Sequence, residues 1–162
     1  MDCDMSVEKV REYLAPLSLA DRVMEFELSS ATVELAAVAV GTEPARIAKS
    51  LTFYAKDGSC IMVVTAGDQK IDNAKFKAVF GCKAKMMSVD DALLATGHAV
   101  GGVCPFANPD GVAVYLDQSL LRFDTVYPAA GSSKSAVRLS CEELFRASRA
   151  LQWVDVCKPR EA

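Results

Sequence analysis

Residues 47–54 read IAKSLTFY and residues 60–65 read CIMVVT, and these two apolar runs decide the fold. Both contain β-branched residues, which are favoured in β-strands. Asp57-Gly58 lies between them, and an Asp-Gly pair between two extended runs is a strong short-range signal for a β-hairpin. We therefore expect two neighbouring antiparallel strands in this part of the chain.

Helical and extended signals alternate on both sides of this hairpin, without a linker or an internal repeat. Cap residues and apolar spacing predict several helices. The first is capped by Ser6 and has Val7, Val10 and Leu14 on one face, and the second is opened by Ser30 or Thr32 and ended by Gly41. The third covers residues 72–80, with Phe76, Val79 and Phe80 on one face. The fourth runs from Ser88 to Gly97, where Ser88 and Asp91 resemble a capping box, and the fifth covers residues 141–151 after a capping box of Ser140 and Glu143.

Apolar runs predict further strands over residues 22–28, 112–116, 123–127 and 136–139, and an extended stretch over residues 153–156. The total is about seven strands and about five helices. Several strands follow one another without a helix between them, which disfavours a strict βαβ repeat. We therefore expect an α+β fold, with a mixed, curved sheet or a partly closed barrel and the helices packed outside it.

Composition restricts the class of protein. A chain of 162 residues with 51% hydrophobic residues is expected to form a single domain over residues 1–162. Six cysteines without a C-x-x-C pair, beside one histidine, argue against a zinc site and point to reduced thiols in a cytoplasmic protein. No apolar run is long enough to span a bilayer, and the net charge of −3 excludes a broadly basic nucleic-acid binder. We therefore expect neither a membrane nor DNA as a partner.

The loop Gly101-Gly102-Val103-Cys104-Pro105 is a candidate for the functional site. Its two glycines allow the main chain to approach a ligand closely, and its proline makes one end rigid. Such a loop can direct main-chain amides at a developing negative charge. Far away in the sequence, Lys49 is a lone cation among apolar neighbours. From the residues alone, a plain turn and a surface lysine explain this pattern equally well.

Three segments together resemble the YbaK/EbsC family, which comprises free-standing relatives of the editing insertion of bacterial prolyl-tRNA synthetase. They are residues 45–51 (ARIAKSL), 97–105 (GHAVGGVCP) and 129–132 (AAGS), in the family's order. The resemblance covers nearly the whole chain, over residues 7–153. It implies hydrolysis of the ester that joins an amino acid to the terminal adenosine of tRNA. The family's lysine corresponds to Lys49, and its G-x-x-x-P loop corresponds to residues 101–105.

The resemblance also implies how the reaction proceeds. An aminoacyl ester is already activated, so the catalyst has mainly to position the substrate, align a water molecule and stabilise an oxyanion. A free ribose hydroxyl of the substrate helps to activate the water, so we expect no protein general base, metal or other cofactor. Lys49 is expected to hold the terminal ribose or phosphate. The loop is expected to hold the carbonyl group, through the glycines Gly101 and Gly102 and the substrate-binding residues Val103, Cys104 and Pro105.

Two other candidates lie near this loop in the sequence or in the motif. His98 is six residues before Cys104, so a Cys–His nucleophile can be imagined, although no orienting acid is evident. Alternatively, His98 follows the end of a helix at Gly97 and is a substrate-binding residue, and Cys104 is a packing residue or a wall of the substrate pocket. Gly131 and Ser132 either bind polar groups of the substrate or simply form a turn.

One basic run stands out against the acidic average. Its lysines fall in a stretch with Asp72 as its only acid, and they are Lys70, Lys75, Lys77, Lys83 and Lys85. The acceptor stem of a tRNA can bind such a run through its phosphates, and Lys70, Lys75 and Lys77 are the first candidates. The alternative is a solvated helix face opposite Phe76 and Phe80.

The sequence thus predicts a trans-editing aminoacyl-tRNA deacylase, an ester hydrolase that removes a small amino acid from mischarged, prolyl-tRNA-related tRNA. Its expected partner is the acceptor end of the mischarged tRNA, with a tRNA synthetase as a second candidate partner. The alternative is a non-catalytic module that binds an amino acid or aminoacyl-tRNA in a regulatory role. The presence of both Lys49 and the complete glycine loop favours the enzyme.

Overall fold

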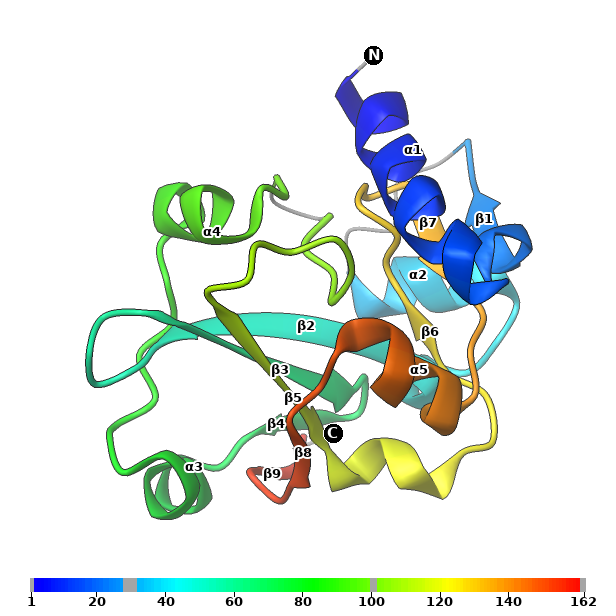
Figure 1. Ribbon diagram of the computed structural model, residues 1–162. Helices are drawn as coiled ribbons and strands as arrows, with labels where there is room; N and C mark the ends of the chain where they lie inside the picture. Colours follow the sequence, from blue (N-terminus) through cyan, green and yellow to red (C-terminus); the bar gives the residue numbers. More distant parts are fainter. Residues whose placement is uncertain (1, 28–31, 100–101, 161–162) are drawn as a thin grey trace.

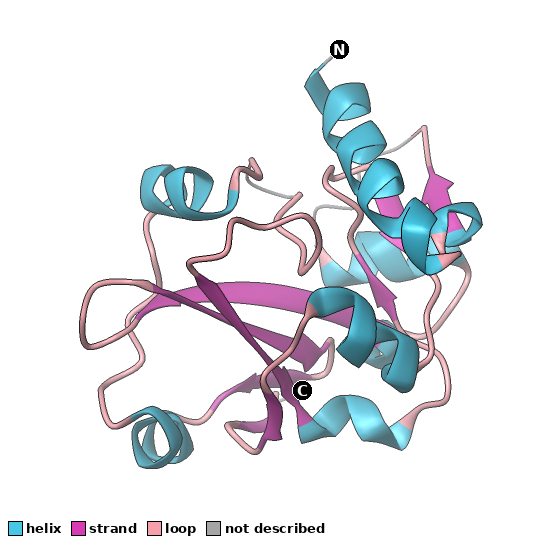
Figure 2. Cartoon of the chain, in the orientation of Figure 1, coloured by secondary structure: helices cyan, strands magenta, loops and turns pink. Residues whose placement is uncertain are grey.

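The computed structural model describes residues 2–27, 32–99 and 102–160 (Figures 1 and 2). Its α-helices are α1 (Asp2–Leu14), α2 (Val33–Val40), α3 (Asn73–Phe80), α4 (Val89–Thr96) and α5 (Cys141–Ser148). Its strands are β1 (Val23–Glu25), β2 (Ile47–Tyr54), β3 (Cys60–Ala66), β4 (Gln69–Ile71), β5 (Val112–Asp117), β6 (Tyr127–Pro128), β7 (Ser135–Val137), β8 (Gln152–Val154) and β9 (Cys157–Pro159). Among these described residues, no helix is long and apolar enough to cross a membrane.

The predicted hairpin is the centre of the main sheet. β2 and β3 pair antiparallel along their whole length, from Ala48 opposite Ala66 to Tyr54 opposite Cys60. Parallel strands extend the sheet on both sides in the order β6-β2-β3-β5-β8. Two small antiparallel ribbons, β1 with β7 and β4 with β9, complete the strands. The expected α+β fold with a mixed sheet is confirmed, and the sheet is open, with β6 and β8 at its two edges.

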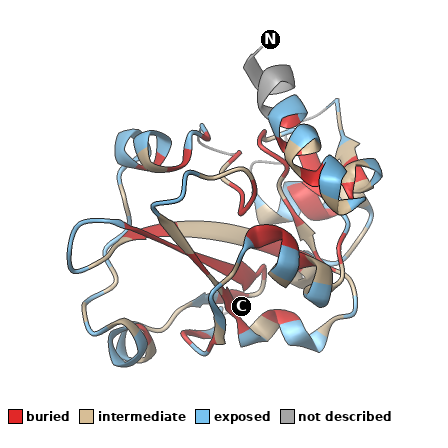
Figure 3. Cartoon of the chain, in the orientation of Figure 1, coloured by how far each residue is buried: buried red, intermediate tan, exposed pale blue. Residues whose placement is uncertain are grey.

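Both faces of the sheet are covered, which explains why β3 is buried along its whole length (Figure 3). Alternate residues of a strand point to opposite faces. On one face, Met62 and Val64 pack into the larger core, to which α1 and α5 contribute. On the other face, Ile61 and Val63 pack with Phe76 of α3.

The smaller core is built on aromatic side chains. The ring of Phe76 lies 4.9 Å from that of Phe53 in β2 and 4.6 Å from that of Phe80. Phe76 is fully buried and Phe80 is partly buried, as expected for the inner face of α3. The expectation that Val79 shares this face is wrong, because Val79 is 41% exposed. With 3.6 residues per turn, Phe76 points between Val79 and Phe80, so Val79 lies at the margin of the buried face.

Helix ends follow the predicted caps at most positions. Thr32 caps α2 by accepting the Leu35 amide, while Ser30 and Leu28 lie outside the described residues. Ser140 and Glu143 form the predicted capping box of α5. Ser6, however, does not begin the first helix, because α1 already starts at Asp2. The helix therefore begins one turn earlier than predicted.

Two other boundaries differ from the prediction. The helix predicted over residues 141–151 ends at Ser148, because Arg149 adopts a left-handed conformation (φ 56°) that breaks the helix before β8. The strand predicted over residues 22–28 is confirmed only for Val23–Glu25. The ribbon formed by β4 and β9 was not predicted, because each strand has only three residues.

The strand predicted over residues 123–127 is wrong for its first residues. Only Val126, which bridges Leu139, and the short β6 are extended and paired. The ring of Phe123 instead lies against two guanidinium groups. Its centroid is 4.9 Å from Cζ of Arg46 and 4.8 Å from Cζ of Arg122. Arg46 also donates to the Asp124 carboxylate at 3.2 Å. These side-chain contacts hold residues 123–124 without a strand ladder.

Gly67 offers a test of how tightly the end of the hairpin is packed. A Cβ at Gly67 would lie 2.0 Å from the main-chain oxygen of Pro44, just before β2. We expect Gly67→Ala to lower the free energy of unfolding by about 1–3 kcal/mol, because main chain has to move. Urea denaturation measures this change.

The matched control is Gly111→Ala, since a Cβ at Gly111 would meet nothing within 4 Å. This control is expected to change stability by less than about 0.5 kcal/mol. Equal stability of the two variants would contradict the close packing at Gly67.

Candidate functional site

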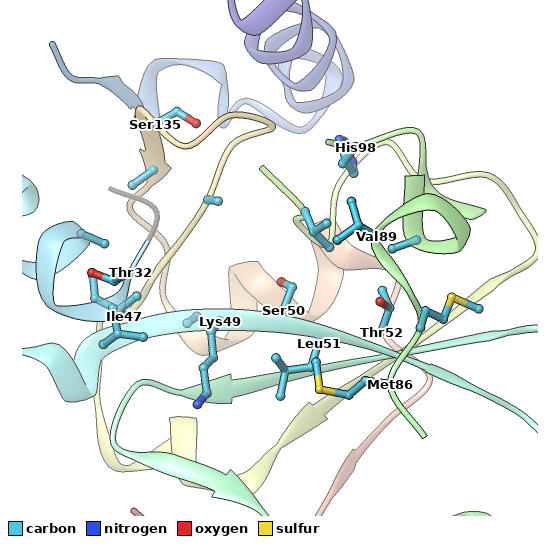
Figure 4. Close-up of a pocket in the computed structure, with 18 of the residues that line it drawn as sticks. Thr32, Ile47, Lys49, Ser50, Leu51, Thr52, Met86, Val89, His98 and Ser135 are labelled. Carbon is cyan, nitrogen blue, oxygen red and sulfur yellow. The ribbon is translucent and has the colours of Figure 1, made fainter. Parts of the chain in front are cut away.

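A cavity of about 360 Å³ lies over the outer edge of β2 (Figure 4). Several elements form its walls: α2, residues 47–52 of β2, the segment Met86–Val89 that leads into α4, and the stretch from β6 to β7. His98 and Val103 join the wall from the predicted loop region. The structure therefore brings Lys49, His98 and Val103, which are far apart in sequence, to one cavity.

The floor of the cavity is a stretch of β2 whose outer edge forms no strand hydrogen bonds. On this edge, β6 pairs with β2 only at Ile47 and Ala48. Further along, the Met87 amide donates to the Thr52 carbonyl at 2.9 Å, and the Tyr54 amide donates to the Lys85 carbonyl at 3.0 Å. Between these two stretches, the outer edge of β2 is open to the cavity at residues 49–51.

Ser50 lies in the middle of this gap. Its side chain points to the same side of β2 as that of Thr52, while Lys49 and Leu51 point to the opposite side (Figure 4). The Ser50 hydroxyl is buried and hydrogen-bonds to no described group. A buried hydroxyl without a partner costs about 1–3 kcal/mol. Such a group at a cavity wall points to a ligand as its missing partner.

Lys49 is held on the other face of the strand. Its ammonium donates to the Gln69 carbonyl in β4 at 2.7 Å. It points away from His98 and Ser50 (Figure 4). Burial lowers the pKa of Lys49, and the positive charge of Arg160 acts in the same direction. Lys49 thus supplies a fixed, partly desolvated charge beneath the open edge.

The glycine loop packs against the second glycine motif. Gly101 and the residue before it lie outside the described residues. Gly102 is buried, and a Cβ there would lie 2.5 Å from the Gly131 carbonyl oxygen, so this close approach requires glycine. The Gly102 amide donates to the Ala99 carbonyl at 2.9 Å. It is therefore already hydrogen-bonded within the loop.

The remaining loop residues face different directions. Val103 lines the cavity, whereas Cys104 is fully buried behind it. Among the described residues, none accepts the amide of Val103 or Cys104. Pro105 lines a separate hollow of about 250 Å³ with Tyr13. The loop thus gives the cavity the side chain of Val103, and it leaves the amides of Val103 and Cys104 without an acceptor among the described residues.

His98 and Cys104 do come together, as one interpretation of the sequence required. The Cys104 sulfur lies 3.5 Å from Nε2 of His98. The same Nε2 lies 2.9 Å from the Phe106 carbonyl oxygen, which requires a proton on this nitrogen. Burial raises the pKa of Cys104 to about 12 and lowers the pKa of His98. A protonated Nε2 has no lone pair to accept the thiol proton, so the pair is poorly suited to form a thiolate nucleophile.

Gly131 and Ser132 form a turn behind the cavity wall. The Ser132 hydroxyl accepts the Lys134 amide at 3.1 Å. Ser135, which lines the cavity, accepts the Ala130 amide at 3.1 Å and donates to the Ser132 carbonyl at 2.9 Å. These hydrogen bonds favour the interpretation of the motif as a turn that fixes the wall.

The predicted tRNA-binding lysines lie outside this cavity. Lys75 forms an ion pair with Asp155 at 3.1 Å and donates to the Cys157 carbonyl at 3.0 Å. Lys77 is exposed on α3, and Lys70 is exposed on β4, where it faces Lys158 of β9. Of the three predicted tRNA-binding lysines, Lys75 is therefore already paired within the protein, whereas Lys70 and Lys77 are exposed.

Sequence reasoning missed the residues of the open edge and of the α4 wall. Ser88 caps α4 by accepting the Asp91 amide at 3.1 Å, as predicted. The Asp91 carboxylate, however, accepts the hydroxyl of Tyr54, so it ties α4 to β2. Hydroxyl residues at alternate positions 50 and 52 of an otherwise apolar strand were the available signal for this site.

The described residues contain no group of three or more histidine, cysteine, aspartate or glutamate side chains that could hold a metal ion. The polar groups at the cavity are instead hydroxyls, main-chain groups and the imidazole of His98, while the ammonium of Lys49 lies on the opposite face of β2. This donor set suits hydrogen bonding to an organic ligand.

Comparison with known proteins adds independent information. Residues 29–147 match the model of a family described as the aminoacyl-tRNA editing domain. An uncharacterized Bacillus subtilis (strain 168) protein, YwhH, is 48% identical over 157 residues, which cover 97% of this chain and 100% of that protein. A proline–tRNA ligase of Pelobacter propionicus (strain DSM 2379 / NBRC 103807 / OttBd1) is 29% identical over 122 residues, which cover 71% of this chain and 21% of the ligase.

The fold is also found among solved structures. A crystal structure described as that of a proposed trans-editing enzyme for prolyl-tRNA synthetase superimposes with a TM-score of 0.86 and 28% sequence identity. The match covers 94% of this chain and 97% of that structure.

The unpaired Ser50 hydroxyl makes a prediction about stability. We expect Ser50→Ala to leave the free energy of unfolding unchanged or to raise it, because the substitution removes a buried group without a partner. Ser135→Ala is the matched comparison, since it leaves the Ala130 amide without its acceptor. It is expected to lower stability by about 1–3 kcal/mol. Thermal and urea denaturation measure both, and an equal loss in the two variants would contradict the assignment of Ser50 as unpaired.

Proposed function

We propose that this chain, which belongs to the aminoacyl-tRNA editing domain family, hydrolyses the ester of tRNA that carries a wrongly attached small amino acid. The match of residues 29–147 to this family confirms the family resemblance inferred from the sequence motifs. One observation supports the proposal above all: the cavity places Lys49, Val103 and the open edge of β2 around one space. The substrate is expected to be the acceptor end of the tRNA, with no cofactor, and residues 1–162 are proposed to act as one domain.

The cavity suits a reaction that needs positioning more than acid–base groups. In the proposed step, a water molecule attacks the ester carbonyl, and the leaving ribose oxygen takes up a proton. The amides of Val103 and Cys104 are the proposed donors to the oxyanion, since the Gly102 amide already binds Ala99. Gly101 and Gly102 then act by shaping the loop, and the ribose hydroxyl of the substrate assists the water.

Lys49 is proposed to set the electrostatic field of the site. Its ammonium is desolvated and anchored by the Gln69 carbonyl, so it stays in place without the substrate. From the opposite face of β2, the ammonium is proposed to act on the cavity through its positive charge, which stabilises developing negative charge; direct contact with the terminal ribose or phosphate would require it to leave the Gln69 carbonyl. His98 is proposed to hold the loop through Phe106 at 2.9 Å rather than to act as a base.

The similarity to part of a proline–tRNA ligase supports prolyl-tRNA as the related tRNA, and a synthetase as the second partner. Lys70 and Lys77 remain available for tRNA phosphates, because both are exposed. Lys75 would first have to leave Asp155. The alternative of a regulatory module that binds without catalysis differs in one measurable respect, the hydrolysis of the ester.

A deacylation panel tests the function. We expect the protein to release alanine, serine, cysteine or another small amino acid from mischarged tRNA faster than spontaneous hydrolysis does. Lys49→Ala is expected to slow this reaction by about tenfold to a thousandfold, because it removes the fixed cation. Lys49→Arg should restore it only in part, since a planar fork replaces a compact ammonium.

The control for Lys49 is Lys56→Ala, which removes an exposed lysine of the β2–β3 hairpin. It is expected to leave the rate unchanged. Tight binding of mischarged tRNA without any release of amino acid would favour the regulatory module. Full activity of a folded Lys49→Ala protein would exclude Lys49 from the mechanism.

The proposed tRNA surface makes a separate prediction. Lys70→Gln combined with Lys77→Gln should weaken tRNA binding and reduce the log–log salt slope by about 1.4–1.8, or about 0.7–0.9 for each lost phosphate contact. Preference between two aminoacyl groups should not change, because phosphates carry no information about the acyl group. Arg138→Gln combined with Arg146→Gln removes the same charge from exposed positions of other elements. If this control lowers the slope equally, the lysines are not a specific contact surface.

A further inference from the structure

The main chain of Ser50 offers one donor and one acceptor at the open edge of β2. In a strand, the N–H and C=O groups of a residue point to the same edge, and residues two apart share that edge. The Thr52 carbonyl and the Tyr54 amide bond outward, to Met87 and Lys85. The amide and carbonyl of Ser50 therefore also point outward, into the cavity. Neither has a partner among the residues that the structure describes.

An aminoacyl group carries the complementary pair of groups. Its α-ammonium is a donor and its carbonyl oxygen is an acceptor, and both belong to one residue. In an antiparallel sheet, two residues that face each other exchange both N–H···O bonds. One amino acid can thus pair with one residue of an open strand edge, as longer peptides do when they add a strand to a sheet.

We propose that the aminoacyl group binds to Ser50 as a single added β-residue. The α-ammonium donates to the Ser50 carbonyl and to the Ser50 hydroxyl, and the acyl carbonyl accepts the Ser50 amide in the bound ester, before the proposed Val103 and Cys104 donors act on the oxyanion. This inference rests on the proposed function, since it names how the same cavity recognises its substrate. One ligand then supplies the missing hydrogen-bond partners of the buried Ser50 hydroxyl and of the Ser50 main-chain amide and carbonyl.

The charges around the cavity agree with this arrangement. No aspartate or glutamate is among the described residues that line it. An ammonium in the cavity must therefore be met by neutral oxygens, and the open edge supplies them at Ser50. Lys49 does not compete for these oxygens, because its ammonium is bonded to Gln69 on the opposite face.

The length of the gap limits the ligand to one residue. β6 closes the edge at Ala48, and the Met87 amide closes it at Thr52. A peptide strand would need further free groups beyond Ser50, and these groups are already bonded. The site therefore selects a free aminoacyl group over a peptidyl or otherwise N-blocked one.

A binding experiment with amide-linked analogues tests the proposal. The probes are 3′-(L-alanylamino)-3′-deoxyadenosine and its L-lactyl counterpart, which has the same shape but a hydroxyl in place of the α-ammonium. Titrations at about pH 6.5 keep the ammonium protonated, since an α-amine has a pKa of about 7.7–8.0. ¹⁵N NMR of the labelled protein gives both the dissociation constant and the response of the Ser50 amide.

We expect the alanyl analogue to bind about tenfold or more tightly than the lactyl analogue, because a hydrogen bond to a charged group is lost in the latter. Binding of the alanyl analogue should slow hydrogen exchange of the Ser50 amide proton by at least about tenfold, because the bonded amide can exchange only after the analogue dissociates. Ser50→Ala should weaken the alanyl analogue by about tenfold and the lactyl analogue much less. Ser59→Ala, at an exposed hairpin position, is the control and should change neither.

Equal affinity for the two analogues, no binding of the alanyl analogue at millimolar concentration, or an unaffected Ser50 amide would each overturn the proposal. The analogues cannot be hydrolysed, so these results do not depend on catalysis. Binding as expected without release of amino acid from tRNA would refute only the proposed deacylation. Release of amino acid without any response of the Ser50 amide would refute only the role of Ser50.

Discussion

The pairing of β2 with β3 along its whole length is the interaction on which the rest of this structure depends. It anchors one edge of β2 from Ala48 to Tyr54. Because that edge is fully bonded, the other edge can be left open without loss of the strand. An open edge in a sheet is normally a hazard, since other chains can pair with it. Here β6 and the Met87 amide close the edge on both sides of Ser50, so no second strand can add.

The site is built from groups that stability alone would not select. A buried hydroxyl at Ser50, a desolvated lysine and two unpaired edge groups all oppose folding. The two cores on either side of the sheet compensate for this cost with closely packed apolar side chains, such as the Phe53–Phe76 ring contact. Unfavourable polar groups gathered at one cavity, rather than scattered, mark the place where a ligand completes the structure.

The sequence predicts local features of this fold better than it predicts the site. Asp57-Gly58 and the capping box at Ser140 and Glu143 act through near neighbours in the chain, so both could be identified correctly. The strand expected at residues 123–125 failed, because Arg46, nearly eighty residues away in sequence, binds that segment. Gly102 was identified from its motif, yet the structure shows that it is required for its approach to Gly131.

The hydroxyls at positions 50 and 52 indicate a polar side of this strand, but residues 47–54 alone do not show that its edge is open at Ser50. The edge is open at Ser50 only because β6 pairs with β2 no further than Ala48, and because the next main-chain bond on this edge is the one from Met87 to Thr52. Neither of these contacts is encoded in residues 47–54. Predicted site residues from the glycine motif therefore describe one wall of the cavity, while the proposed recognition site lies on the hairpin itself.

Recognition through the main chain has a consequence for selectivity. An edge that binds the ammonium and the carbonyl, which all aminoacyl groups share, contributes equally to every amino acid. Discrimination must then come from the space left for the side chain, whose walls include Ile47, Val103 and Ala129. Such apolar walls exclude bulky side chains but separate those that differ by one methylene by only about 1–3 kcal/mol. Under the proposed function, a site of this design removes small amino acids as a class, and it leaves the identity of the tRNA to contacts outside the cavity.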